Sequence, residues 1–230
     1  KLGYCYMYGM GREEDIESAI YWYKKAMDQG NGEAMYYLAE IYANGNGVPQ
    51  NYGEAARLYR MSAESGYNRA QFNLAECYEQ GLGVAPNMQE AIVWYKMSAD
   101  GGSTRALNKI IKYYFSDANA NYAEGVVWCR RAAENGNSEA QYRLANCYAT
   151  GKGVQKNIDE AIVWYRSAAE RGHAQARYEL AELNMHGGLQ NYEEAFAIYT
   201  ESAAEGVVGA QYNLCLLYTS PSPRDKRQSR

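Results

Sequence analysis

Cysteines, histidines, glycine-rich loops and repeated glutamates are the residues of this chain that could carry chemistry. Cysteine and histidine could ligate a metal ion, and a cysteine thiolate could act as a nucleophile. A Gly-x-Gly loop could cradle a phosphate group, and a glutamate could act as a general acid. Each chemistry needs its residues in a defined cluster or sequence context, so the spacing decides which of them is indicated.

The spacing of the cysteines indicates packing. Cys5, Cys77 and Cys147 each lie three residues after an anchor leucine of a repeated pattern. The same position elsewhere holds Ile41, Tyr113 and Leu183. Cysteine at such a position is predicted to act as a small apolar core residue. Cys129 lies alone on a different part of the repeat, so the sequence indicates no disulfide framework and leaves the compartment open.

The other candidates also lack the context that their chemistry needs. His173 and His186 stand alone, without the clustered ligands of a metal site, and are predicted to be loop or groove-surface residues. Gly45-x-Gly47 follows a predicted helix and lacks the lysine and Ser/Thr of a phosphate-binding loop. No nucleophile, base and orienting group occur together. We therefore predict no catalytic residue, no metal site and no cofactor.

These residues all belong to one pattern that recurs about every 36 residues. Its anchor residues are Leu2, Leu38, Leu74, Ile110, Leu144, Leu180 and Leu214, separated by 36, 36, 36, 34, 36 and 34 residues. Both short steps shorten the loop between the two halves of the repeat. Self-similarity of this length predicts an all-α solenoid of antiparallel helix-turn-helix repeats of about 36 residues, because one repeat cannot bury its apolar face alone.

Each repeat is predicted to contain two helices. Ala34, Leu38 and Ile41 form one apolar stripe, and Gly45 ends the first helix because glycine adopts the left-handed conformation readily. The second helix begins at an asparagine that is followed three residues later by glutamate, which predicts a reciprocal capping box. The asparagines are Asn51, Asn87, Asn121, Asn157 and Asn191.

Small and aromatic residues are predicted to fill the space between the helices. Alanines recur where the helices must approach closely, as at Ala39 and Ala55. The Trp94-Tyr95 pair and its copies could form a platform for a nucleotide, but their helical spacing favours packing. The chain has 24 tyrosines and only 3 phenylalanines, which suits a two-layer stack in which a ring packs and its hydroxyl stays near water.

The pattern resembles the Sel-one-like repeat family, a longer-looped relative of the tetratricopeptide repeat. The resemblance extends over residues 2–214 and is clearest in the third repeat, at Leu74-Ala75, Gly81-Leu82-Gly83-Val84 and Glu90-Ala91. The fourth repeat lacks the Gly-x-Gly-Val loop, and Cys129 replaces the tyrosine that follows Trp128. The resemblance implies a right-handed superhelix, and residues 1–214 are predicted to form one such solenoid.

The resemblance also implies work as a scaffold or adaptor that binds a protein or peptide. Two alternatives remain open at the level of the sequence. The segment could be the recognition arm of a larger enzyme or membrane protein, or it could be a hydrolase of the β-lactamase type claimed for some cysteine-rich relatives. Those relatives pair a cysteine on each helix of a repeat, which no repeat of this chain does.

By analogy with tetratricopeptide units, the partner-binding groove is expected along the first helices. With the anchor counted as position 5, positions 3, 7 and 11 lie opposite the buried stripe. Asn108 interrupts the aromatic column at position 3. The predicted groove residues are Tyr36, Glu40, Asn44, Phe72, Glu76, Gln80, Lys112, Ser116, Tyr142, Asn146, Thr150, Tyr178, Glu182 and His186. An aromatic column beside polar groups suits an extended peptide or a partner helix, although each ring could instead pack between repeats.

Residues 215–230 are predicted to be foreign to the natural protein. From Cys215 the repeat gives way to a segment that the transposon end and adapter of a common sequencing-library kit can encode. We expect a helix to extend to about Tyr218 and the rest of the tail to be disordered. The chain also enters mid-helix at Lys1, so both ends are expected to be fragment ends, and any signal peptide or anchor would lie outside them.

The charge of the chain argues against nucleic acid as a partner. The formal net charge is −4, and it becomes −7 without the four basic residues and one acidic residue of the tail. A strong basic face is therefore not expected, and no apolar run is long enough to span a bilayer. Neither the oligomeric state nor the localisation follows from the sequence.

Resequencing the locus without transposon-based library chemistry tests the origin of the tail. We expect residues 215–230 to be replaced by a different sequence, whereas recovery of the same tail would show that it is natural.

Overall fold

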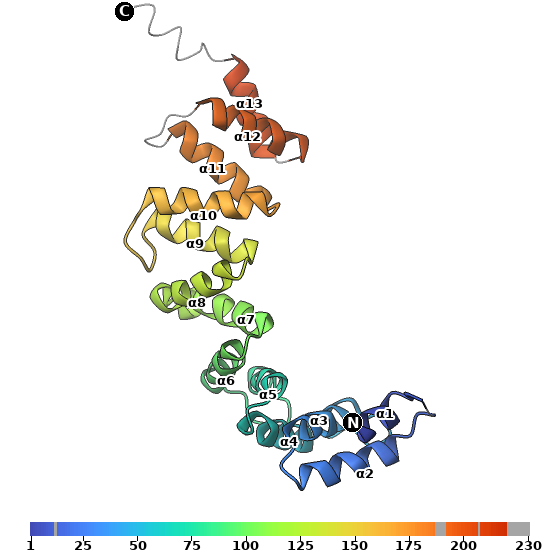
Figure 1. Cartoon of the computed structure of the whole chain (residues 1–230). Coiled ribbons are helices and arrows are strands. Elements are labelled where there is room, and N and C mark those ends of the chain that lie inside the picture. The colour runs from blue at the N-terminus through green and yellow to red at the C-terminus, as the bar shows by residue number, and fades with distance from the viewer. Residues whose placement is uncertain (12, 187–191, 207, 220–230) are drawn as a thin grey trace, which may run out of the picture. The chain divides into compact units, whose positions relative to one another are not determined.

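The computed structural model describes residues 1–11, 13–186, 192–206 and 208–219, and this part of the chain contains α-helices, one 3₁₀ helix and no β-strand. It forms two compact units, Lys1–Ile110 and Ile111–Arg230 (Figure 1). The elements are α1 (Leu2–Met7), α2 (Ile16–Met27), α3 (Gly32–Asn44), α4 (Tyr52–Glu64), α5 (Asn68–Gln80), α6 (Met88–Asp100), α7 (Thr104–Tyr114), η1 (Asp117–Asn119), α8 (Tyr122–Glu134), α9 (Ser138–Thr150), α10 (Ile158–Glu170), α11 (Ala174–His186), α12 (Tyr192–Ala204) and α13 (Val208–Thr219).

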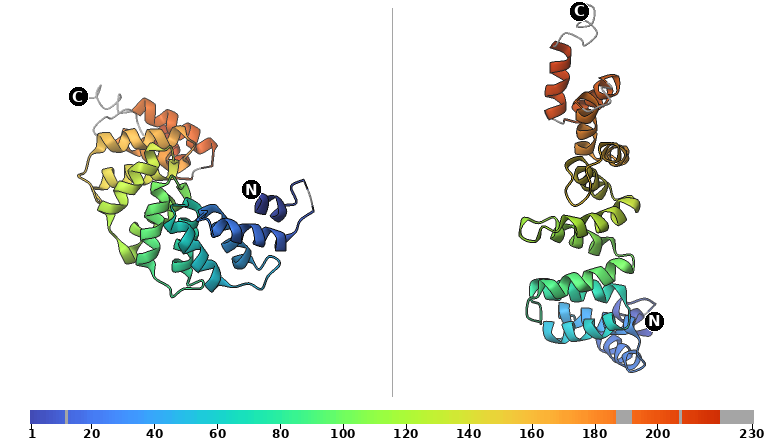
Figure 2. Two further views of the ribbon diagram at one scale, coloured as in Figure 1. Left: turned by 60° about the horizontal axis from the view of Figure 1, so that its bottom comes forward. Right: turned by 90° about the vertical axis from the view of Figure 1, so that its left-hand side faces the viewer.

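The helices alternate as the repeat predicts. Odd-numbered helices are the first helices of the repeats, even-numbered helices are the second, and Figure 2 shows them as antiparallel pairs within each unit. Each helix in the first unit packs on the next one along the chain from α1 to α6. The boundary between the units falls in α7, the first helix of the irregular fourth repeat. The predicted all-α solenoid fold is confirmed.

Buried apolar side chains hold each pair together. Leu38 and Ile41 of α3 are fully buried, and so are Ala39 and Ala55, which lie where α3 meets α4. In the first unit the buried residues from Met7 to Cys77 form one continuous core. Alanine at the contact lets two helix backbones approach closely, and the larger Leu and Ile side chains fill the remaining space.

The asparagine caps are confirmed, but the reciprocal half of the capping box is wrong. The Asn51 side chain accepts a hydrogen bond from the Glu54 amide at 3.0 Å. The Asn51 amide, however, donates to the Tyr42 carbonyl at 2.9 Å, so it is not free for the Glu54 carboxylate. Glu54 instead pairs with Arg57 at 2.7 Å. The asparagine therefore closes the loop back onto the first helix as well as capping the second.

The same pair of bonds recurs in other repeats. Amide groups of α6, α8 and α10 donate to Asn87, Asn121 and Asn157, and each of these asparagines donates its own amide to a tyrosine carbonyl of the preceding first helix. In the first repeat Asp15 takes this role for α2. The predicted cap at Asn191 and the tail from residue 220 lie outside the described residues.

The second glycine of the Gly-x-Gly loop touches the preceding repeat. Gly83 has a φ of +72°, and a Cβ there would lie 2.0 Å from the Tyr52 carbonyl oxygen at the start of α4. In the second unit a Cβ on Gly153 would lie 2.4 Å from the Tyr122 backbone at the start of α8. These glycines are therefore required both for their left-handed backbone and for close contact between neighbouring repeats.

Comparing Gly83→Ala with Gly66→Ala should separate the cost of the left-handed backbone from the cost of the contact between repeats. Gly66 also has a positive φ, of +87°, but a Cβ there would meet no atom within 4 Å. We expect Gly66→Ala to cost about 1–2 kcal/mol of backbone strain. Gly83→Ala should cost about 1–3 kcal/mol more because of the clash with Tyr52. Urea denaturation followed by circular dichroism measures both variants, and equal losses would contradict the proposed contact between repeats.

Candidate functional site

The predicted groove residues come from the first helices of both units, with two differences from expectation. Ser116 lies beyond the end of α7, where it precedes η1, because the fourth repeat has a different loop. His186 ends α11, and its side chain lies outside the described residues. The exposed members of the set are Asn44, Gln80, Lys112 and Thr150.

The aromatic column at position 3 packs on the second helix of its own repeat. Ring centroids are 6.0 Å apart for Tyr36 and Tyr59 in the first unit. In the second unit they are 6.0 Å apart for Tyr142 and Tyr165, and also for Tyr178 and Tyr199. Tyr36, Tyr142 and Tyr178 are half-buried, so each ring is held by its neighbour and still presents part of its surface.

Phe72 differs from the tyrosines of this column. Its ring packs on Tyr95 at 5.4 Å and is only 4% exposed. The Arg105 guanidinium lies 4.2 Å from the ring centroid, in a cation–π contact. Phe72 is therefore covered by the chain itself.

The polar residues at position 7 join neighbouring repeats. Glu40 accepts hydrogen bonds from the Tyr59 hydroxyl of its own repeat and from Asn73 of the next first helix, the latter at 2.8 Å. Glu182 accepts in the same way from Tyr199 at 2.5 Å and from Asn213. This tyrosine–carboxylate–asparagine ladder occupies oxygens that the sequence assigned to partner binding.

The ladder changes with the sequence of each repeat. Asn146 accepts from Tyr165 at 2.8 Å in the fifth repeat. In the third repeat Tyr95 donates to Glu79 at 2.5 Å, and Lys109 pairs with Glu79 at 2.6 Å. Glu76, the position 7 residue of that repeat, lies 3.6 Å from Lys109 and 3.9 Å from Arg105. The position 7 carboxylates of Glu40, Glu76 and Glu182 therefore make hydrogen bonds or ion pairs within the chain.

The fourth repeat has no residues for this ladder. Cys129 stands where the other repeats have the tyrosine donor, and position 7 holds Lys112, whose ammonium group cannot accept a hydrogen bond. Cys129 is fully buried, and its thiol lies 3.2 Å from the Ala140 carbonyl oxygen. The fourth repeat therefore lacks both the tyrosine donor and the position 7 acceptor.

Burial keeps the tyrosines of the ladder protonated. Burial, then the Glu40 carboxylate, raises the pKa of Tyr59 far above its ordinary value of 10. Burial and the Glu182 carboxylate raise the pKa of Tyr199 in the same direction. The hydroxyl groups therefore remain hydrogen-bond donors at neutral pH.

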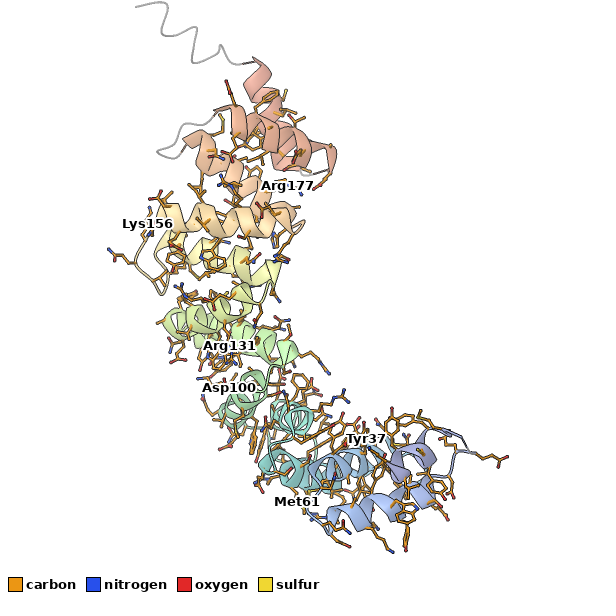
Figure 3. The ribbon with its side chains drawn as sticks, in the orientation of Figure 1. Tyr37, Met61, Asp100, Arg131, Lys156 and Arg177 are labelled. Atoms are coloured by element: carbon orange, nitrogen blue, oxygen red, sulfur yellow. The ribbon has the colours of Figure 1, made fainter. Side chains whose placement is uncertain are left out.

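Sequence reasoning missed a tyrosine cluster in the first unit, which we call the tyrosine surface. Its rings contact one another at centroid distances of 4.5–6.0 Å. Tyr37, labelled in Figure 3, contacts rings from α1, α2 and α3. The members are Tyr4, Tyr8, Tyr23, Tyr36, Tyr37, Tyr59 and Tyr67. Tyr4, Tyr37 and Tyr67 line a hollow of about 1350 Å³.

The tyrosine surface was missed because it draws on repeat positions outside the expected stripe. Tyr67 is the residue before α5, and its ring lies 5.2 Å from Tyr36 of the preceding repeat. His173 holds the same repeat position before α11, and its ring stacks on Tyr142 at 4.5 Å. The presence of a ring at this position in two repeats was the one sequence feature that could have indicated these ring contacts.

His173 serves the fold rather than a reaction. Its Nδ1 accepts a hydrogen bond from the Ala176 amide at 3.1 Å and so caps α11. Its Nε2 lies 3.1 Å from a Glu139 carboxylate oxygen. Both ring nitrogens are therefore engaged by the chain.

Three buried cysteines of the described residues hold protonated thiols, and no cluster of metal-ligating side chains forms in this part of the chain. No set of three His, Cys, Asp or Glu side chains in this part of the chain could hold a metal ion. Burial raises the pKa of the Cys77 and Cys147 thiols to about 11 and that of Cys129 to about 12. Cys77 and Cys147 are buried, as predicted, and their thiols stay protonated at neutral pH. Among the described helices, none has the length and apolar character of a membrane span.

Comparison with known protein families identifies the repeat of this chain. The model of the Sel1 repeat matches residues 1–31, 32–67, 68–103, 113–137, 138–173, 174–207 and 208–230. The chain belongs to the Sel1 repeat family. The last matched segment includes the residues that we attribute to adapter sequence. No curated protein sequence matches the chain.

Two solved structures of Sel1 repeat proteins are similar to this chain. A protective antigen present in uropathogenic Escherichia coli strains, displaying an SLR fold, is 34% identical with a TM-score of 0.65; the match covers 94% of this chain and 47% of the antigen. This chain thus spans about half of the length of that antigen. A Sel1 repeat protein from Oxalobacter formigenes is 32% identical with a TM-score of 0.57, over 87% of this chain and 82% of the other.

Sel1 repeat proteins are generally scaffolds for protein interaction, and the repeat is typically not catalytic. The described residues are consistent with a non-catalytic repeat. Their aromatic rings pack on one another, and their polar side chains bond to neighbouring repeats.

Removal of one hydroxyl should show that the ladder stabilises the fold. Tyr59→Phe deprives the half-buried Glu40 carboxylate of a donor and should cost about 2 kcal/mol of unfolding free energy. Tyr52→Phe removes a hydroxyl from a ring that is 39% exposed and should change stability by less than about 0.5 kcal/mol. Equal urea midpoints for the two variants would contradict a stabilising role for the ladder.

Proposed function

We propose that the first helices of this Sel1 repeat chain bind an extended peptide or a helix of a partner protein through their tyrosine rings. The observation that carries the proposal is the exposed part of rings that are otherwise held in place. Tyr36, Tyr142 and Tyr178 each pack on a second-helix tyrosine and keep part of the ring accessible. Aromatic side chains that are already ordered lose little entropy when a partner binds.

The two units present this surface separately. In the first unit Tyr4 is 37% exposed and Tyr8 is 53% exposed, and their rings contact each other at 4.5 Å. In the second unit Tyr212 occupies position 3 of the last repeat and is 65% exposed. Each unit therefore offers rings that could anchor apolar side chains of a partner.

Fewer polar groups are open to a partner than the sequence suggested. The carboxylates of Glu40 and Glu182 already accept hydrogen bonds within the ladder. The exposed position 11 side chains are Asn44, on the same helix as Glu40 and Tyr36, and Gln80, on α5. We propose that these amides orient a bound peptide while the tyrosine rings anchor it.

A double substitution tests the proposal in the second unit. Peptides selected from a displayed random library on the whole chain provide the ligand. Tyr142→Ala with Tyr178→Ala should weaken peptides captured by this unit at least tenfold, because each lost aromatic anchor costs about 1–2 kcal/mol. Fluorescence anisotropy measures the affinity, and circular dichroism shows whether the helices persist.

Two controls separate binding from folding. Tyr142→Phe with Tyr178→Phe keeps the rings and should keep most of the affinity. Tyr21→Ala with Tyr52→Ala removes exposed tyrosines of second helices, which are 52% and 39% exposed, and should leave binding unchanged. Loss of helical signal together with binding in the first variant, or equal loss in the second-helix control, would contradict the proposed site.

A further inference from the structure

The hollow beside the tyrosine surface is basic although the protein is acidic. The chain has a formal net charge of −4. The charged side chains that line the hollow are Lys1, Lys25 and Arg69, against the single carboxylate of Glu33. A local excess of positive charge on an acidic protein favours a ligand that carries negative charge.

Arg69 is an exposed cation of this hollow. It is exposed in the first turn of α5, and none of the ion pairs between described residues involves it. Arg105, at the same position of the next repeat, lies over Phe72 and 3.9 Å from Glu76. Lys25 lies 4.8 Å from the Tyr21 ring centroid and 5.7 Å from that of Trp22.

The surroundings of Arg69 are tyrosine rings. Tyr37 and Tyr67 line the hollow with it. Burial raises the pKa of Tyr36 and of Tyr67, and the positive charge of Arg69 opposes this rise at both rings. The Arg69 side chain also forms a hydrogen bond with Tyr67. The nearby Glu40 carboxylate is already bonded to Tyr59 and Asn73. An incoming anion would therefore meet a guanidinium group flanked by aromatic surface.

We propose that this hollow binds an acidic segment of a partner protein, with the Arg69 guanidinium holding a carboxylate and the tyrosine surface holding the neighbouring apolar side chains. The inference rests on the proposed function and names the class of partner for the first unit. A single guanidinium group matches the two oxygens of a carboxylate, whereas phosphate sites in peptide-binding proteins usually gather several arginines.

The experiment selects peptides from a displayed random library on the whole chain and measures synthetic copies by fluorescence anisotropy. We expect the selected peptides that compete for the first unit to be enriched in Asp and Glu next to apolar residues. Arg69→Gln should weaken their binding about tenfold or more, and Arg69→Lys should weaken it less, because lysine keeps the charge but loses the planar fork. Added salt should weaken binding to the wild-type chain.

A control variant and a second test variant distinguish failure of this inference from failure of the proposed function. Arg57→Gln removes an exposed arginine of the same unit that is paired with Glu54, and it should not affect binding. Tyr4→Ala with Tyr8→Ala tests the tyrosine surface itself. Peptides that require these tyrosines but are neither acidic nor sensitive to Arg69→Gln would overturn this inference and leave the proposed function standing. Peptides insensitive to every tyrosine variant, or no enriched peptide at all, would overturn both.

Discussion

Contact between neighbouring repeats is the constraint on which the rest of this structure depends. A pair of helices has too little interior to bury its own apolar stripe, so each pair must pack against the next one. Gly83 and Gly153 show how close that approach is, because even one added methyl group would overlap the backbone of the preceding repeat. The loops, caps and small residues of the repeat all serve this spacing.

Tyrosine is used in two ways in this fold. The second-helix tyrosines of the ladder are buried, and their hydroxyl groups donate to carboxylate or amide oxygens. Two of these acceptors, Glu40 and Glu182, also receive a bond from the next repeat. Tyr36, Tyr142 and Tyr178 of the first helices pack on those buried rings and are themselves half-buried. The same network that joins the repeats therefore also orders the rings that we propose as contacts for a partner.

The fourth repeat lacks both the tyrosine donor and the position 7 acceptor of the ladder. Without a tyrosine at Cys129, an acceptor at Lys112 would have no donor, and both positions differ from the other repeats. The boundary between the two compact units lies in α7 of this repeat. The boundary between the two units therefore lies in the repeat whose sequence departs most from the pattern.

The sequence alone determined the helices and their order, because a 3.6-residue apolar stripe, a glycine stop and an asparagine cap are local features. It also identified Cys77 and Cys147 as buried, although Cys5 at the same repeat position is only half-buried, and it identified the capping role of residues such as Asn51. Only the tertiary structure decided which polar groups are free. Glu40 has the spacing of a groove residue, yet Tyr59 and Asn73, 19 and 33 residues away, occupy its oxygens. The tyrosine surface likewise combines rings from α1 to α4 and from Tyr67, which precedes α5. Periodicity within one helix carries no information about which distant rings will meet.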